Sequence, residues 1–190
     1  MIFIKKNGKN YKMLLLNFTG QPGAGKSTIA AGVFHILKKR KWNAELITEY
    51  TKELIMQEDY WSLNDELIVF TEKYIRIKRM KNVDLVVTDS PLINSMVYGK
   101  EQYSESGSKF FYDISLKFDS LYFVVEPKTE YIPFGRMPDE NKAVEAGKEI
   151  ISILDNIPHP VYKIEGNDAG MNKAVDIIEQ EARKRKYVTF

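Results

Sequence analysis

Residues 20–28 of this 190-residue chain read GQPGAGKST and limit the possible folds more than any other stretch does. The spacing is that of a phosphate-binding P-loop, a glycine-rich turn between a strand and a helix. Gly20, Gly23 and Gly25 allow the backbone to come so close to a phosphate that its N–H groups surround the anion. A glycine-rich turn without a ligand is the alternative, and it is disfavoured because the expected strand and helix flank the motif.

The polar side chains of this motif have separate tasks. Lys26 offers a positive charge to the β- and γ-phosphates of a nucleotide, and Ser27 offers a hydroxyl ligand to Mg²⁺. The following helix directs the positive end of its dipole at the anion. The sequence therefore predicts ATP and Mg²⁺ as cofactors, with the nucleotide bound by Gly20, Gly23, Ala24, Gly25, Lys26, Ser27 and Thr28.

Composition places the chain among ordinary globular domains. Its length suits one sizeable core, and 44% hydrophobic residues with a formal net charge of +2 fit neither a disordered nor a membrane protein. Because cysteine is absent, disulfides, thiolate metal sites and thiol nucleophiles are excluded. No long apolar run or signal-peptide pattern occurs, so we expect a cytoplasmic location and no membrane partner. His35 and His159 lack metal-ligand partners at a useful spacing, so structural roles are expected for both.

Apolar runs alternate with helical patterns along the chain. Strands are expected at residues 13–19, 44–48, 83–88, 121–125 and 161–164, and helices at 27–39, 50–58, 64–81, 91–99, 106–117, 140–154 and 173–184. This alternation predicts an α/β fold of three layers, with a doubly wound, five-stranded parallel sheet in the order 2-3-1-4-5. Ser90 is predicted to cap the helix at 91–99, with Pro91 as its first residue.

Residues 13–190 are expected to form one domain. Residues 1–12 precede it, and the pair Asn7-Gly8 favours a small β-ribbon there. A loose leader is an equally good interpretation, since Met13 itself stands at the start of the first apolar run.

Two acidic residues follow predicted strands, at the sheet edge where α/β proteins bind ligands. Asp89 ends the strand expected beside the P-loop strand, so Ser27 and Asp89 are the predicted metal ligands. Glu49 ends the next strand out and is predicted to orient the attacking hydroxyl of an acceptor. The sequence leaves open which of the two carboxylates takes the proton.

Residues 128–139 show no periodicity but contain prolines, Gly135 and Arg136. This composition predicts a flap over the site, with Arg136 reaching the transferred phosphoryl group. A surface turn with a solvated Arg136 is the alternative.

Basic residues gather at two further places. Lys73, Arg76 and Arg79 are spaced to share a helical face, which either holds a phosphorylated ligand or, as the favoured interpretation, is solvated. The run at residues 183–186 (RKRK) is interpreted as a solvated chain end, with nucleic-acid contact as the less favoured alternative.

Four segments resemble a known family: GQPGAGKST, LITEYTKEL at residues 46–54, VVTDSPL at 86–92 and PFGR at 133–136. They resemble small P-loop kinases commonly encoded by bacteriophages and often labelled only as ATPases. These are similar to nicotinamide riboside kinases and, more distantly, to deoxynucleoside and nucleoside monophosphate kinases. In relatives of the riboside-kinase type a basic residue follows the acidic one after three positions, as Lys52 follows Glu49 here.

The resemblance implies ATP- and Mg-dependent phosphoryl transfer to a nucleoside- or nucleotide-like small molecule. Its catalytic residues would be Lys26, Glu49, Asp89 and Arg136. One alternative is a kinase acting on a nucleic-acid end or a modified base. Another is a nucleotide-dependent switch or ATPase without a small acceptor, although the chain lacks an N-K-x-D guanine signature and is short for a ring-forming ATPase.

Overall fold

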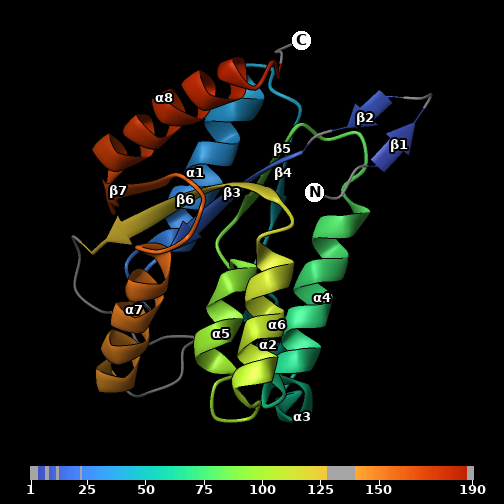
Figure 1. The fold of residues 1–190 in the computed structure, drawn as a ribbon. Coiled ribbons are helices and arrows are strands. Elements are labelled where there is room, and N and C mark those ends of the chain that lie inside the picture. Colours follow the sequence, from blue (N-terminus) through green and yellow to red (C-terminus); the bar gives the residue numbers. More distant parts are fainter. Residues whose placement is uncertain (1–3, 7–8, 12, 22, 128–139, 188–190) are drawn as a thin grey trace.

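The computed structural model describes residues 4–6, 9–11, 13–21, 23–127 and 140–187. Its central parallel sheet consists of β3 (Leu14–Thr19), β4 (Ala44–Ile47), β5 (Leu85–Thr88), β6 (Asp119–Glu126) and β7 (Val161–Glu165). The strands lie in the order β4-β5-β3-β6-β7 (Figure 1). Numbered along the chain this order is 2-3-1-4-5, so the predicted fold class and strand order are confirmed.

Helices cover both faces of the sheet (Figure 1). One face carries α1 (Lys26–Lys39) and α8 (Asp168–Lys184), which also pack on each other. The other face carries α4 (Glu66–Arg79), the 3₁₀ turn η1 (Leu92–Asn94), α5 (Ser95–Tyr98), α6 (Glu105–Ser115) and α7 (Glu140–Leu154). The shorter helices α2 (Tyr50–Met56) and α3 (Tyr60–Leu63) connect β4 to α4.

The central strand β3 leads directly into the P-loop and fixes where the loop begins. All six of its residues are buried, as its sequence LLLNFT predicts for a strand with neighbours on both faces. Leu14, Leu16 and Phe18 pack toward α1 and α8, whereas Leu15 packs with residues of α4 and α6. β5 and β6 flank β3 in parallel register, so the carboxyl ends of all three strands meet at one edge.

At the N-terminus, β1 (Ile4–Lys6) and β2 (Lys9–Tyr11) form a separate two-stranded antiparallel sheet (Figure 1). Ile4 pairs with Tyr11 in its register. The turn at residues 7–8 lies outside the described residues.

Side-chain caps explain one helix that was not predicted and one that begins earlier than predicted. The segment at residues 59–62, expected to be a break, contains α3, whose N-cap Asp59 accepts a hydrogen bond from the Ser62 backbone N–H at 3.1 Å. α8 begins at Asp168 rather than near residue 173, and its N-cap Asn167 accepts from the Gly170 N–H at 2.9 Å.

The predicted helix at 91–99 is wrong in its first turn, and Ser90 is not its cap. Pro91 has extended angles (φ −56°, ψ 144°) and precedes η1, with α5 beginning only at Ser95. The Ser90 N–H donates to the Thr88 hydroxyl at 3.2 Å, which ties this residue back to the strand it follows. The 3₁₀ turn then carries Leu92 and Ile93 into the core.

The predicted flap at residues 128–139, including Arg136, lies outside the described residues. Within the described ranges, no helix combines the length and the apolar character needed to cross a membrane.

Candidate active site

The P-loop leaves the end of β3 through glycines with backbone angles that other residues rarely adopt. Gly20 has φ 130°, and a Cβ there would lie 2.7 Å from the Val125 carbonyl oxygen of β6. Gly25 has φ 84° and is the N-cap of α1. The loop therefore turns directly from the central strand into the helix whose N-terminus faces it, which is the geometry of an anion site.

Two glycines that the sequence did not single out bring other elements against this loop. A Cβ on Gly147 of α7 would lie 2.7 Å from the Gln21 Cβ, and one on Gly166, after β7, would lie 2.7 Å from the Ala24 carbonyl oxygen. α7 and the turn before α8 thus pack directly on the P-loop. The available signal was a glycine inside a predicted helix and another just after a predicted strand, positions where close backbone approach is common.

Lys26 stands at the start of α1 and folds over the loop that precedes it. Its ammonium donates to the carbonyl oxygens of Gly20 at 3.2 Å and Gln21 at 3.0 Å. The charge is thereby held at the glycine turn, as its predicted role on the nucleotide phosphates requires.

Lys52, in the first turn of α2, connects the predicted metal ligands with Glu49. Its Nζ lies 2.6 Å from the Ser27 Oγ, 3.0 Å from a Glu49 carboxylate oxygen and 3.9 Å from the Asp89 Oδ2. One ammonium thus touches residues at the ends of two strands and in the P-loop helix. The structure brings Ser27, Glu49 and Asp89 together around the Lys52 ammonium, and it places Lys26 at the adjoining glycine turn.

Asp89 is a buried carboxylate with an unusual environment. Its side chain is 6% exposed. Burial raises its pKa and the negative charge of Glu49 adds to this, whereas the Ser27 hydroxyl and Lys52 act in the opposite direction; the net pKa is raised. Its Oδ1 is buried without a hydrogen-bond partner among the described residues.

These donors fit Mg²⁺. A hydroxyl and a carboxylate are hard oxygen ligands, and Mg²⁺ in nucleotide sites takes only one or two carboxylates beside phosphates and water. The unpartnered Asp89 Oδ1 supplies the oxygen such an ion needs. No group of three or more His, Asp or Glu residues that could hold a metal occurs in the described part of the chain.

Glu49, the N-cap residue of α2, is an ionised carboxylate at neutral pH. Burial raises its pKa, but the charge and hydrogen bond of Lys52 and the hydrogen bond from Thr51 outweigh it and lower the pKa below its usual value. The Thr51 hydroxyl donates to its Oε1 at 2.8 Å. Glu49 therefore accepts hydrogen bonds at the mouth of the site but is a weak base.

An exposed aromatic residue stands near Glu49. Tyr98 ends α5 and is 47% exposed. Desolvation by neighbouring atoms and the negative charges of Glu49 and Glu66 raise its pKa to about 12, so the phenol keeps its proton. Tyr98 offers a partly exposed aromatic ring and a hydrogen-bond donor, and the charge of Glu49 is close enough to raise the pKa of its phenol; no sequence pattern indicated this residue.

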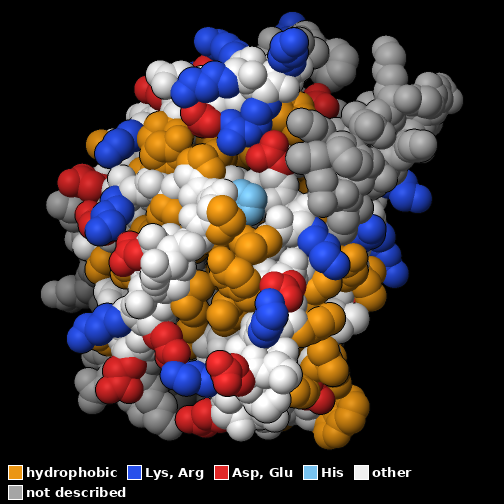
Figure 2. Space-filling view, viewed as in Figure 1, with side chains coloured by type: hydrophobic (Ala, Val, Ile, Leu, Met, Phe, Trp, Pro, Cys, Tyr) orange, Lys and Arg blue, Asp and Glu red, His pale blue; other side chains and the backbone are white. Residues whose placement is uncertain are grey.

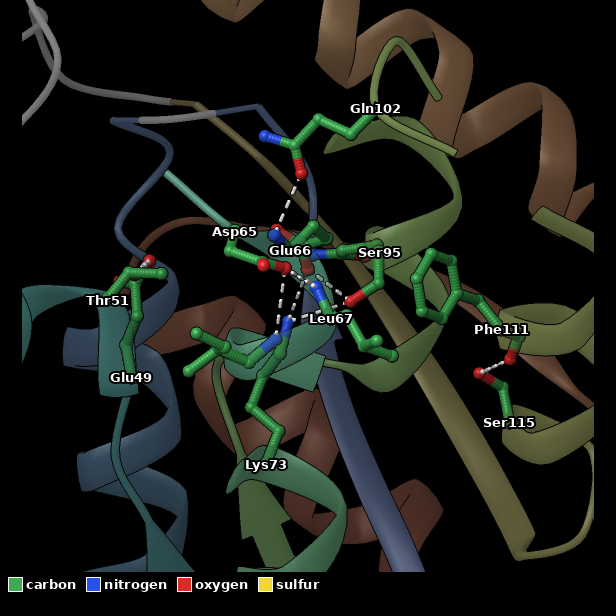
Figure 3. A network of polar contacts seen from close by, with 12 residues as sticks. Glu49, Thr51, Asp65, Glu66, Leu67, Lys73, Ser95, Gln102, Phe111 and Ser115 are labelled. Carbon is green, nitrogen blue, oxygen red and sulfur yellow. Dashed lines mark hydrogen bonds and ion pairs between the residues drawn. The ribbon is translucent and has the colours of Figure 1, made fainter. Parts of the chain in front are cut away.

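The prediction that Lys73, Arg76 and Arg79 share a solvated or ligand-binding face is wrong. On an α-helix, side chains three residues apart differ in direction around the helix axis by about 60°, so these three side chains cover an arc of about 120°. Lys73 points inward and is bonded to Glu66 and Ser95 (Figure 3). Arg76 binds both carboxylate oxygens of Glu53 at 2.6 Å and so joins α2 to α4, while Arg79 is exposed.

Three of the four residues in the basic run at 183–186 form ion pairs, and the fourth, Lys186, is exposed. Arg183 pairs with Glu179 at 3.5 Å and Lys184 with Glu181 at 2.7 Å. Arg185 pairs with Asp119 at 3.3 Å. These charges therefore do not form a free basic patch.

Comparisons with known proteins agree with this fold. The NadR protein in complex with NR superposes with a TM-score of 0.62 at 20% identity over 90% of this chain and 52% of that chain. The NadR protein in complex with NAD and AMP-PNP gives 0.60 at 16% identity over 90% and 49%. Deoxyadenosine kinase from M. mycoides with bound dATP gives 0.51 at 17% identity over 89% and 99%.

At these identities the similarity shows the fold, and it confirms at that level the resemblance to P-loop kinases. The chain spans about half the length of the NadR chains. No curated protein matches the sequence. The model of the family AAA_28, described as an AAA domain, matches residues 15–169. Because this match covers most of the chain, the protein belongs to the AAA_28 family of AAA domains.

Proposed function

We propose that this protein is an ATP- and Mg-dependent phosphotransferase that moves the γ-phosphoryl group to a hydroxyl of a nucleoside- or nucleotide-like small molecule. The observation that carries the proposal is the position of Glu49. This ionised carboxylate is joined to the P-loop serine by one ammonium, that of Lys52. A nucleotide-binding site alone has no need of it, whereas an acceptor hydroxyl does.

On the nucleotide side, the P-loop amides and Lys26 would bind the phosphates, with the N-terminus of α1 directed at them. Ser27 and Asp89 would hold Mg²⁺, which supplies charge neutralisation to the phosphates when bound. Phosphoryl transfer passes through a loose transition state, so positioning and electrostatic stabilisation carry most of the catalysis. Lys26 is held by the Gly20 and Gln21 carbonyl oxygens, and Ser27 and Asp89 both lie within 3.9 Å of the Lys52 ammonium, so these groups are already positioned for that task.

On the acceptor side, Glu49 would accept a hydrogen bond from the attacking hydroxyl and so orient it. Its lowered pKa makes orientation its main role, because a weak base removes a proton only late in the reaction. Tyr98 would contact the acceptor through its exposed ring, as aromatic side chains commonly do with planar bases.

The alternative of a nucleic-acid substrate loses most of its sequence support. Lys73 and Arg76 are engaged with carboxylates, as are Arg183, Lys184 and Arg185. On the face shown in Figure 2, positive and negative side chains are interspersed. Nucleic-acid binding favours a continuous basic surface.

A transfer screen with γ-labelled ATP and Mg²⁺ tests the proposal. The acceptors are nucleosides, nucleoside monophosphates, nicotinamide riboside and 5′-hydroxyl oligonucleotides. We expect label on one small-molecule class and slow phosphate release without an acceptor. Lys26→Ala, verified as folded by circular dichroism, is expected to abolish the transfer.

Two outcomes would contradict the proposal. Label on oligonucleotides alone would support the nucleic-acid kinase instead. Rapid ATP hydrolysis that no acceptor changes would identify a plain ATPase.

A further inference from the structure

The contacts of Lys52 show a second positive charge at the place where the metal ligands meet. Its ammonium donates to the Ser27 Oγ at 2.6 Å and lies 3.9 Å from the Asp89 Oδ2. These are the two side chains whose oxygen atoms fit Mg²⁺. The same ammonium is anchored by Glu49 at 3.0 Å. The protein thus directs one of its own cations at the oxygens that the metal requires.

The ammonium and a divalent ion cannot share these oxygens. The Ser27 oxygen accepts a hydrogen bond from Lys52, and the Ser27 hydroxyl is close enough to Asp89 to act against the rise in the pKa of that carboxyl. A metal bound to the Ser27 oxygen would stand within a few ångströms of the ammonium, and like charges so close in a partly buried site repel each other strongly. One of the two must leave for the other to bind.

The Lys52 ammonium is the group that can move away from the Ser27 and Asp89 oxygens. Its side chain is 38% exposed, in contrast to the 5% of Lys73, and it reaches the site from a short surface helix. If the ammonium moves away from Ser27, it can still pair with Glu49. The movement opens no cavity in the core. A nucleotide phosphate would offer the displaced ammonium a new anionic partner, whereas a metal ion alone offers none.

We propose that Lys52 is a positioning residue that competes with Mg²⁺ for Ser27 and Asp89, so that the metal binds well only together with nucleotide phosphates. The proposal deepens the proposed function and rests on its assignment of Mg²⁺ to these two residues. It assigns to Lys52 the exclusion of free divalent ions and the alignment of Glu49 with the P-loop serine.

The test measures Mn²⁺ affinity by electron paramagnetic resonance on the full chain without nucleotide. Mn²⁺ shares the preference of Mg²⁺ for carboxylate and hydroxyl oxygens. Lys52→Met is expected to bind Mn²⁺ at least about tenfold more tightly than the wild type, the least that removal of a close like charge provides. Lys38→Met is the matched control, because Lys38 is a similarly exposed lysine that pairs with Glu45 away from the site, and its affinity is expected to equal that of the wild type.

A third variant locates the gain. Adding Ser27→Ala to Lys52→Met is expected to remove most of the increase, because the competed oxygen is then absent. An affinity of Lys52→Met equal to the wild type would overturn the proposal. So would an increase that Ser27→Ala leaves unchanged.

A second measurement needs no variant and applies even if Lys52→Met fails to fold. Acetylation of the wild-type protein is followed at each lysine by mass spectrometry, with and without saturating Mn²⁺. Displacement of the ammonium is expected to raise the labelling of Lys52 relative to Lys38, and an unchanged ratio would overturn the proposal. Neither readout involves phosphoryl transfer, so the absence of any acceptor in the transfer screen would refute the kinase proposal and leave this result interpretable.

Discussion

Lys73 and Glu66 form an ion pair inside the protein, with Nζ and Oε1 3.4 Å apart and side chains only 5% and 9% exposed. The Ser95 hydroxyl donates to the same Glu66 oxygen at 2.5 Å and accepts from Lys73 at 3.1 Å (Figure 3). Both members of the pair belong to α4, and Ser95 joins them to the start of α5, the helix that carries Tyr98. Removal of the pair is therefore expected to affect both stability and the shape of the site.

Lys73→Met is expected to lower the free energy of unfolding by about 3–5 kcal/mol, because it leaves Glu66 buried without a compensating charge. Urea denaturation at neutral pH measures the change. Lys109→Met is the control, since Lys109 forms an exposed pair with Asp113 and its loss is expected to cost less than about 1 kcal/mol.

The double variant Glu66→Gln with Lys73→Met removes both charges and is expected to recover much of the lost stability. A double variant as unstable as Lys73→Met alone would show that packing, rather than the unpaired carboxylate, causes the loss.

Asp89→Asn is expected to leave the protein at least as stable as the wild type, with a gain of up to about 1 kcal/mol. The fold raises the pKa of Asp89, so the folded protein binds this proton more tightly than the unfolded chain does. Stability therefore falls as the pH rises from the ordinary value of 3.8 through the folded value, and at neutral pH the ionised group opposes folding. The amide removes that opposition.

Denaturant midpoints at neutral pH test this, with Asp113→Asn, an exposed carboxylate, as the control. Mg·ATP is expected to stabilise the wild type and to have much less effect on Asp89→Asn. A large loss of stability in Asp89→Asn without ligand would show that its carboxylate supports the fold instead of the metal.

The fold could be predicted because its strands are short apolar runs, which are typical of strands buried in a parallel sheet. LLLNFT in β3 is an almost continuous apolar run that is buried at every position, and the edge strands β4 and β7 were each located to within one residue at either end. The P-loop fixed the direction of the chain at the end of β3, and a right-handed parallel sheet allows few other orders. Glu49 and Asp89 could be placed at the site because each follows a strand.

The remaining contacts depend on side-chain positions that spacing does not determine. Lys52 meets a serine 25 residues earlier, on another helix. Lys73 was predicted on a surface because it stands in a row of cations three residues apart, and its partner Ser95 lies 22 residues further along the chain. Ser90 and Pro91 fitted a helix start, but burial of Leu92 and Ile93 favoured a 3₁₀ turn.

His159 is expected to make the protein less stable in mild acid. Burial lowers its pKa below 6.5, with Arg185 acting in the same direction and Asp119 and a backbone hydrogen bond opposing them. The unfolded chain therefore takes up the proton first. The contribution of the neutral ring is fully present above pH 6.5 and is lost as the pH falls from there through the folded value.

Urea denaturation at pH 7.5 and pH 5.5 measures this effect. His159→Gln is expected to lose less stability than the wild type between the two pH values, whereas His35→Gln, at an exposed position of α1, is expected to match the wild type. Equal losses in all three proteins would assign the pH dependence to other groups.

Glu49→Gln is expected to lower the rate of phosphoryl transfer at least about a hundredfold while ATP affinity changes little. The Glu49 carboxylate would orient the acceptor hydroxyl by accepting its hydrogen bond. The side-chain amide of the glutamine can turn its NH₂ group to the hydroxyl as readily as its oxygen, so the orientation is lost. Glu45→Gln makes the same chemical change on β4, where Glu45 forms an exposed pair with Lys38, and is expected to leave transfer unchanged.

The pH dependence separates orientation from proton removal. Lys52 and Thr51 keep the pKa of Glu49 below 4.5, so its ionisation is complete well before neutral pH. Between pH 6 and 8 the transfer rates of the wild type and Glu49→Gln are therefore expected to follow curves of the same shape, with the variant lower throughout. An ionisation in this range that the wild type shows and Glu49→Gln lacks would mean that Glu49 titrates near neutrality, and it would then act as the base that takes the proton of the acceptor.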